Sequence, residues 1–212
     1  MIAGYPYHIT QRGNYQQKAF VNEKDYTRYL IWLEEYRIKY HLLIIAYCLM
    51  PNHVHFIALP EKINSLAKTF QTCHMRYAQY FNKKRKISGH LWQSRFYSCA
   101  LDEKHLYAAI RYVETNPVRA KLVKYPEDWK WSSAKSRIHN QAGILTLENI
   151  DKILSITNWR EYLYESTDEN LIQKIRNNTL TGKPLGDIVF VQKFENLLKR
   201  KLTSIPKGRP NK

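Results

Sequence analysis

Two histidines, His53 and His55, stand one residue apart in an otherwise apolar stretch of the chain. In a β-strand, side chains at i and i+2 point to the same face and lie about 6.6 Å apart along the backbone. Two imidazoles at that spacing can bind one metal ion. A pair of hydrogen-bonded core or surface histidines would have the same pattern, so the spacing alone leaves both interpretations open.

A tyrosine and an amide, Tyr112 and Asn116, form the second pair that could do chemistry. They fall in a predicted helix that begins at Asp102, a good N-cap, and stops before Pro117, because the residue before a proline disfavours helical geometry. Its apolar residues recur at helical spacing and would face the core: Leu106, Ala109, Ile110 and Val113. Tyr112 and Asn116 share a stripe beside that face, so both can approach the histidines if the helix packs on the sheet. Spacing alone would leave Tyr112 a structural tyrosine, one of 16 in the chain.

The elements that must position these residues follow a β-α-β-β-α-β order. Strands are predicted from their strand-forming side chains at residues 7–12, 42–48, 53–59 and 91–98. A tight turn at residues 50–52 would make a hairpin that carries both histidines on its second strand. Asn22 and Asp25 predict the cap of a first helix, and a second helix is expected at residues 65–81. The order predicts an α+β fold with a ferredoxin-like (RRM-like) antiparallel sheet and packed helices.

The charge of the chain indicates a nucleic-acid partner. Its 34 Lys and Arg residues against 18 Asp and Glu residues give a net charge of +16, accompanied by aromatic rings that can stack on bases. A highly soluble basic protein without a polyanion partner would share this composition. Two basic blocks are the expected phosphate contacts, and the residues singled out in them are Lys83, Lys84, Arg85, Lys86, Lys199, Arg200, Lys201, Lys207 and Arg209.

The three cysteines are expected to be reduced packing residues, because they are odd in number, far apart and set in apolar or aromatic surroundings. The amino terminus has no basic segment followed by an apolar one, and no apolar run approaches membrane-spanning length. We therefore expect a soluble cytoplasmic protein without a membrane partner.

Two segments in the right order make the chain similar to a known family. Residues 50–56 (MPNHVHF) followed by residues 112–120 (YVETNPVRA) resemble the REP-associated tyrosine transposases. These enzymes are relatives of the IS200/IS605 single-tyrosine transposases within the HUH endonuclease superfamily. Supporting matches lie at residues 7–13 (YHITQRG), 91–98 (LWQSRFYS) and 181–186 (TGKPLG), so the resemblance spans nearly the whole chain.

The resemblance implies a metal-dependent single-stranded DNA endonuclease and strand transferase that acts next to palindromic, REP-like hairpins through a 5′-phosphotyrosine intermediate. By position, it makes Tyr112 the nucleophile and His53 and His55 metal ligands. Asn116 becomes the third ligand, a role that related enzymes often give to glutamine. Mg²⁺ is the expected ion, although two imidazoles suit Mn²⁺ better. The arginines within the matching segments are expected to contact DNA: Arg12, Arg95 and Arg119.

The chain is expected to divide into a nuclease domain, residues 1–125, and a helical, basic C-terminal DNA-binding extension, residues 126–212. In the extension, helices are predicted from Asp168 and from Asp187, with a Gly/Pro break between them. They could form a helix-turn-helix-like DNA-binding module or a packing appendage, and residues 206–210 a minor-groove arm or a solvated tail. A non-catalytic nucleic-acid-binding module on a similar sheet and a His-x-His hydrolase of small substrates are the rival functions. Whether the protein is a monomer or a homodimer stays open.

Overall fold

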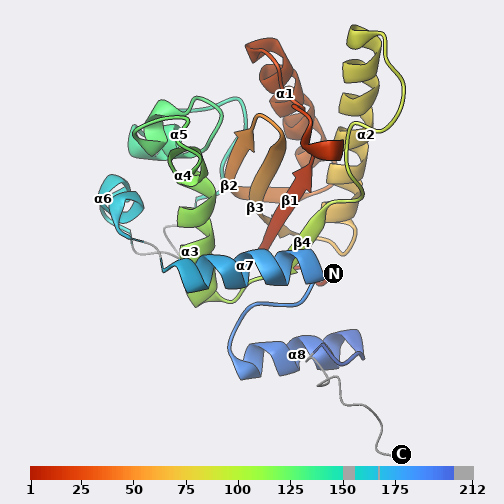
Figure 1. The fold of residues 1–212 in the computed structure, drawn as a ribbon. Helices are drawn as coiled ribbons and strands as arrows, with labels where there is room; N and C mark the ends of the chain where they lie inside the picture. Colours follow the sequence, from red (N-terminus) through yellow and green to blue (C-terminus); the bar gives the residue numbers. More distant parts are fainter. Residues whose placement is uncertain (150–155, 167, 203–212) are drawn as a thin grey trace, which may run out of the picture.

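The computed structural model of the protein describes residues 1–149, 156–166 and 168–202. Four strands form one antiparallel sheet: β1 (Tyr7–Arg12), β2 (Leu42–Met50), β3 (His53–Pro60) and β4 (Tyr97–Ala100). Their spatial order is β2-β3-β1-β4 (Figure 1). One helix separates β1 from β2 and another separates β3 from β4, as in a ferredoxin-like sheet. The predicted α+β fold is confirmed.

The register of the strands gathers polar side chains on one face of the sheet. Thr10 of β1 lies opposite His55 of β3, and Arg12 lies opposite His53. Residues directly opposite each other in an antiparallel pair share a face, and so do alternate residues of one strand. His8, Thr10 and Arg12 therefore project from the same face as the two histidines of β3. We call this the histidine face.

The opposite face is covered by α1 (Glu23–Lys39) and α2 (Ser65–Arg85) (Figure 1). α1 begins with the predicted cap: the Asn22 side chain accepts from the Asp25 N–H, and the Asp25 carboxylate accepts from the Asn22 N–H. Large aromatic rings fill the space between this helix layer and the sheet: Phe20, Tyr29, Phe56, Phe70 and Tyr77. The tyrosines along α1 thus include core residues.

The histidine face is covered by α3 (Glu103–Glu114) and α7 (Glu169–Thr181) (Figure 1). Asp102 caps α3 as predicted, because its carboxylate accepts from the His105 N–H at 2.8 Å. The helix is interrupted at Thr115 and a short α4 (Asn116–Arg119) follows. The predicted stop is therefore a break, and Pro117 falls in the first turn of α4, where its missing N–H costs no hydrogen bond.

Shorter helices complete the described part of the chain: η1 (Asn14–Gln16), η2 (Pro126–Asp128), α5 (Ala134–Ile138), α6 (Trp159–Tyr164) and α8 (Ile188–Leu198). The helices predicted from Asp168 and Asp187 are α7 and α8.

Buried Glu114, at the end of α3, is hydrogen-bonded to the residues that begin α5 and α6. Its carboxylate accepts from Ser133 Oγ at 2.5 Å and from Trp159 Nε1 at 2.7 Å. Among the described residues, no helix is long and apolar enough to span a bilayer.

One predicted helix end is wrong. α2 continues beyond residue 81 to Arg85, so the first three residues of the basic block form its last turn, and Lys86 caps it in a left-handed conformation at φ 55°. Cations are favourable in that position, because the last carbonyls of a helix carry partial negative charge. The block is thus a helix terminus rather than the start of a loop.

One predicted strand boundary is also wrong. β4 begins at Tyr97 and not at residue 91. Trp92, within the predicted strand, is buried, and its indole Nε1 donates to the His74 carbonyl oxygen of α2 at 3.1 Å. Trp92 forms a single antiparallel bridge with Gly13, the chain then leaves the sheet at residues 93–96, and regular pairing with β1 begins only at Tyr97.

Candidate active site

A cavity of about 430 Å³ opens between the histidine face, α3 and α7. The predicted nucleophile and all three predicted metal ligands line it: Tyr112, His53, His55 and Asn116. Arg12, a predicted DNA contact, lines it as well. Seven further residues in its wall were not predicted as site residues, and three of them, His8, Arg176 and Thr179, make the contacts described below. The fold therefore places the predicted nucleophile beside the predicted metal ligands and adds further polar side chains around them.

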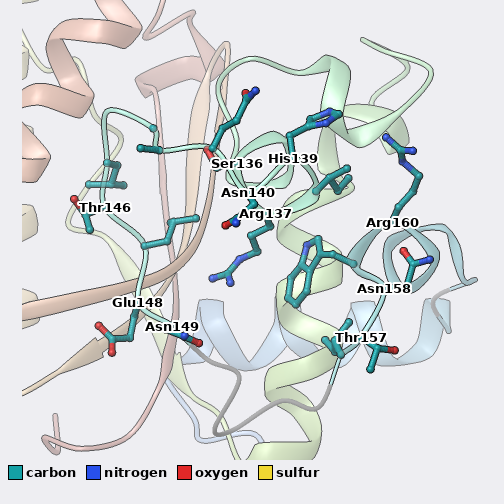
Figure 2. A pocket seen from close by; sticks show the side chains of 18 residues that line it. Ser136, Arg137, His139, Asn140, Thr146, Glu148, Asn149, Thr157, Asn158 and Arg160 are labelled. Atoms are coloured by element: carbon teal, nitrogen blue, oxygen red, sulfur yellow. The ribbon is translucent and has the colours of Figure 1, made fainter.

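A larger cavity, of about 850 Å³, lies elsewhere, between the segments 136–149 and 156–160 (Figure 2). The residues between those two segments, 150–155, lie outside the described part of the chain. No predicted site residue is among the described residues that line it. We therefore place the candidate active site in the smaller cavity.

The rings in the smaller cavity contact one another. The centroids of the stacked His8 and His55 rings are 5.2 Å apart, and the His53 ring stands nearly perpendicular to that of His55 at 4.9 Å. The Tyr112 ring meets His55 at 5.5 Å and His8 at 5.8 Å, both edge to face. A phenol carried by α3 thus packs directly on imidazoles carried by β1 and β3.

All three imidazoles are neutral at pH 7. Burial lowers the pKa of His8 to about 3. Burial, assisted by the charges of Arg12 and Arg176, lowers the pKa of His53 to about 4. The pKa of His55 lies well below its ordinary value, because the ring is buried and two imidazoles and the same two guanidiniums surround it. Neutral imidazole is the form that binds a metal ion.

A chain of hydrogen bonds fixes the tautomer of His55. The Thr179 hydroxyl donates to the Ile175 carbonyl oxygen at 2.7 Å, so its oxygen accepts from His8 Nδ1 at 2.7 Å. A neutral His8 that donates through Nδ1 has a lone pair on Nε2, which accepts from His55 Nδ1 at 3.0 Å. The remaining nitrogen of His55, Nε2, is therefore unprotonated and able to bind a cation.

The tautomer of His53 follows in the same way. Its Nδ1 lies 2.6 Å from Asn52 Oδ1. The orientation of that amide is set by its Nδ2, which donates to the Gln16 carbonyl oxygen at 3.3 Å. Oδ1 must then accept from His53 Nδ1, and Nε2 of His53 is also left unprotonated. Both predicted ligands present an Nε2 lone pair.

Asn116 is the uncharged third member of this donor set. Its side chain is buried, and its Nδ2 has no hydrogen-bond partner within the residues that the structure describes. In residues 1–149, 156–166 and 168–202, no group of three or more His, Cys, Asp and Glu side chains could hold a metal ion. Two imidazole nitrogens and one amide fit a divalent ion that takes its other ligands from water or phosphate oxygens.

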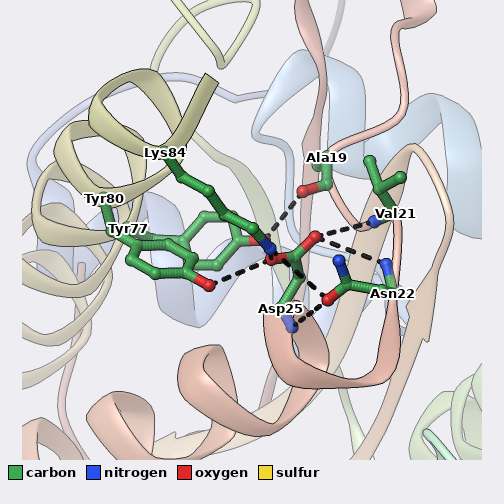
Figure 3. A network of polar contacts seen from close by, with 7 residues as sticks. All are labelled: Ala19, Val21, Asn22, Asp25, Tyr77, Tyr80 and Lys84. Carbon is green, nitrogen blue, oxygen red and sulfur yellow. Dashed lines mark hydrogen bonds and ion pairs between the residues drawn. The ribbon is translucent and has the colours of Figure 1, made fainter. Parts of the chain in front are cut away.

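One residue of the basic block at the end of α2 forms an ion pair within the protein. Lys84 Nζ lies 2.6 Å from Asp25 Oδ1, in a network that includes Tyr80 and Asn22 (Figure 3). Burial alone would raise the pKa of Asp25, but hydrogen bonds from Lys84 and the Val21 N–H outweigh it and hold the pKa below its ordinary value. Lys84 thus links α2 to the start of α1.

The other predicted DNA contacts differ in their surroundings. Arg119 makes two hydrogen bonds to the Glu169 carboxylate, at 2.6 and 3.0 Å. Arg95 is exposed and lines an adjoining cavity of about 750 Å³. Further exposed residues are Lys83, Arg85, Lys86, Lys199, Arg200 and Lys201. Lys207 and Arg209 lie outside the described residues. Among the predicted DNA contacts that the structure describes, Arg12 is the one that lines the candidate active site. Contact of all these residues with DNA stays a prediction.

Among the unpredicted residues His8, Arg176 and Thr179, His8 belongs to a pattern that the sequence shows. The alternation in β1 places His8, Thr10 and Arg12 on one face, and the same alternation identified the pair on β3. Arg176 and Thr179 had no such pattern. They lie on α7, far along the sequence, and their position depends on how that helix packs.

Known proteins similar to this chain include transposases. The family model "Transposase IS200 like" matches residues 2–116. One similar solved structure is the REP-associated tyrosine transposase bound to a REP hairpin. It is 20% identical, with 70% of this chain and 88% of that chain covered and a TM-score of 0.52. Another is a candidate transposase from Deinococcus radiodurans, 20% identical, with 54% of this chain and 92% of that chain covered and a TM-score of 0.38. No curated protein matches the chain. The first structure shows the fold.

Proposed function

Because the chain belongs to the family of IS200-like transposases, we propose that it is a single-stranded DNA endonuclease and strand transferase that acts through a 5′-phosphotyrosine intermediate. The observation that carries this proposal is the buried Tyr112, whose ring contacts two neutral imidazoles and whose hydroxyl accepts from a guanidinium. A structural tyrosine in a core would not need that polar surrounding.

The proposed step is an ester exchange at phosphorus. The Tyr112 oxygen forms a bond to phosphorus and loses its proton to solvent, the bond from phosphorus to the 3′ oxygen breaks, and that oxygen takes up a proton. A 3′-hydroxyl can reverse the exchange, so cleavage and strand transfer need no ATP. Arg12 lies in the same cavity and can neutralise a phosphate. The packing of Tyr112 on the imidazoles holds the phenol in place for attack.

His53, His55 and Asn116 would hold a divalent ion, Mg²⁺ or Mn²⁺. When bound, such an ion would supply positive charge beside the oxygens of the scissile phosphate. The neutral state of both imidazoles and the Nε2 lone pairs fixed by Asn52 and His8 support this part of the proposal.

The proposed substrate is single-stranded DNA beside a palindromic hairpin. The first similar structure is described as bound to a REP hairpin, and the charge of +16 suits a polyanion. We further propose that residues 1–125 form the nuclease domain and that the basic region in 126–212 holds the hairpin stem. α7 is an exception within that region, since it forms part of the cavity wall.

The test is Tyr112→Phe, which removes one oxygen and almost no volume. The variant should bind hairpin DNA as the wild type does and form no denaturation-resistant protein–DNA adduct. Tyr97→Phe, which alters an exposed tyrosine at the same cavity, is the matched control and should keep the adduct. An adduct in Tyr112→Phe would contradict the assignment. A wild type that binds DNA without any adduct would favour the non-catalytic binding module.

A further inference from the structure

Arg176 of α7 makes a direct contact with the proposed nucleophile. Its Nε donates to the Tyr112 hydroxyl oxygen at 3.2 Å, and its guanidinium carbon lies 5.4 Å from the centroid of the Tyr112 ring. The contact joins residues 64 positions apart. It exists because α7 packs across α3 and β4.

Arg176 differs from the arginines on the neighbouring helices in its partners. Arg111 of α3 is paired with Glu165, and Arg119 of α4 is paired with Glu169. Arg176 forms no salt bridge within the described part of the chain, where its hydrogen bond to Tyr112 is the one that it makes. It acts on Glu169 only through its charge, which adds to the hydrogen bond from Arg119 in lowering the pKa of that carboxyl. Its two Nη groups therefore remain available to donate to an anion in the cavity.

The charge of Arg176 faces the place where a phosphate would sit. Both Arg176 and Arg12 line the cavity, and both lower the pKa of His53 and His55 through their charge. A guanidinium presents its donors in a planar fork that matches two phosphate oxygens. Nε of Arg176 already donates to the tyrosine oxygen, so a phosphate bound by its Nη groups would lie next to that oxygen.

We propose that Arg176 is a catalytic residue of this enzyme, with Nε on the Tyr112 oxygen and Nη on the scissile phosphate. The inference rests on the proposed function and deepens it. Arg176 brings the attacking oxygen and phosphorus together and stabilises the negative charge that grows on the phosphoryl oxygens as the new bond forms and the bond to the 3′ oxygen breaks. The residue lies 60 positions beyond the end of the family match at residue 116, so the C-terminal region supplies part of the chemistry.

The test compares Arg176→Met and Arg176→Lys with Lys174→Met in the full-length chain. Lys174 is exposed on the same helix and does not line the cavity, so its variant removes an equal charge without touching the site. At saturating hairpin DNA, Arg176→Met should slow adduct formation by about 100-fold, the usual effect of losing one such donor. Arg176→Lys should keep part of the rate because it keeps the charge. Lys174→Met should react as the wild type does.

A second readout separates chemistry from structure. Resealing of the adduct by a 3′-hydroxyl passes through the same transition state, so Arg176→Met should slow cleavage and resealing by the same factor. A variant that reacts at the wild-type rate with a smaller reactive fraction would show a structural role and overturn the proposal, as would equal rates for Arg176→Met and Lys174→Met. A wild type without any Tyr112 adduct would instead overturn the proposed function and this inference together.

Discussion

Thr179→Val is the most informative change outside the predicted site, because it replaces a hydroxyl by a methyl group at nearly constant volume. The hydroxyl oxygen accepts from His8 Nδ1 at 2.7 Å and is buried. Valine leaves Nδ1 of His8 without a partner in either tautomer, and an unsatisfied buried donor or acceptor costs about 1–3 kcal/mol. The free energy of unfolding in urea should fall by that amount.

The same change should also reach the metal ligands. Without an acceptor at Nδ1, His8 is free to carry its proton on Nε2 and donate to His55 Nδ1. His55 must then carry its own proton on Nε2, where it would block metal binding. Loss of such an outer partner typically costs about 10–100-fold in metal affinity or activity. Single-turnover cleavage should fall by that factor, and a higher Mn²⁺ concentration should restore part of it.

Thr179→Ser is the matched control, because it keeps the hydroxyl and removes only the methyl group. It should cleave at close to the wild-type rate. If valine and serine at residue 179 reduce cleavage equally, the methyl packing matters and the hydrogen-bond chain does not. Wild-type cleavage by Thr179→Val would refute the reasoning outright.

Four further outcomes are expected. His53→Ala or His55→Ala should lower cleavage by orders of magnitude while hairpin binding persists, and chelation of the wild type should do the same; cleavage that survives chelation would exclude the metal role. Since the donor set contains no carboxylate, calorimetry should show weak Mn²⁺ binding to the free protein and tighter binding with DNA present, and equal affinities would contradict this. Truncation after Gly186 keeps α7 and should flatten the salt dependence of hairpin binding by about 0.9 in log–log slope per lost phosphate contact, whereas an unchanged slope would place the stem elsewhere. Burial lowers the pKa of His74 to about 3, so below about pH 6.5 the unfolded chain takes up a proton that the folded one does not. His74 should then contribute about 2 kcal/mol to the fall in the free energy of unfolding from pH 7 to pH 5, in addition to the contributions of His8, His53 and His55, and His74→Gln should lose less by that amount.

Short-range patterns were sufficient to predict much of the fold. The cap formed by Asn22 and Asp25 involves residues three positions apart, and the cap at Asp102 is equally local. The His-x-His spacing predicted a shared face, because strand geometry fixes the direction of alternate side chains. The strand predicted at residues 91–98 is interrupted at residues 93–96, between a bridge from Trp92 to Gly13 and the regular strand that begins at Tyr97, and strand propensity does not mark that interruption.

The rest of the site depends on contacts between distant segments. The hydrogen bond between His8 and Thr179 joins residues 171 positions apart, and no local pattern marks either partner as interacting with the other. Composition has a similar limit: it does not show which cations are paired, whereas the fold pairs Lys84 with Asp25 and Arg119 with Glu169. Composition thus indicated the kind of partner but not which cations can contact it.

The late position of α7 in the sequence has a consequence for the synthesis of the protein. A ribosome makes the chain from its amino terminus, so Tyr112 and both metal-site histidines emerge before Arg176 and Thr179. A nascent or prematurely terminated chain therefore carries a nucleophile without the guanidinium that holds it and without the hydroxyl that orients His8. Under the proposed function, DNA is cut at the full rate only after α7 has been made, and a chain that ends before Arg176 cuts DNA slowly.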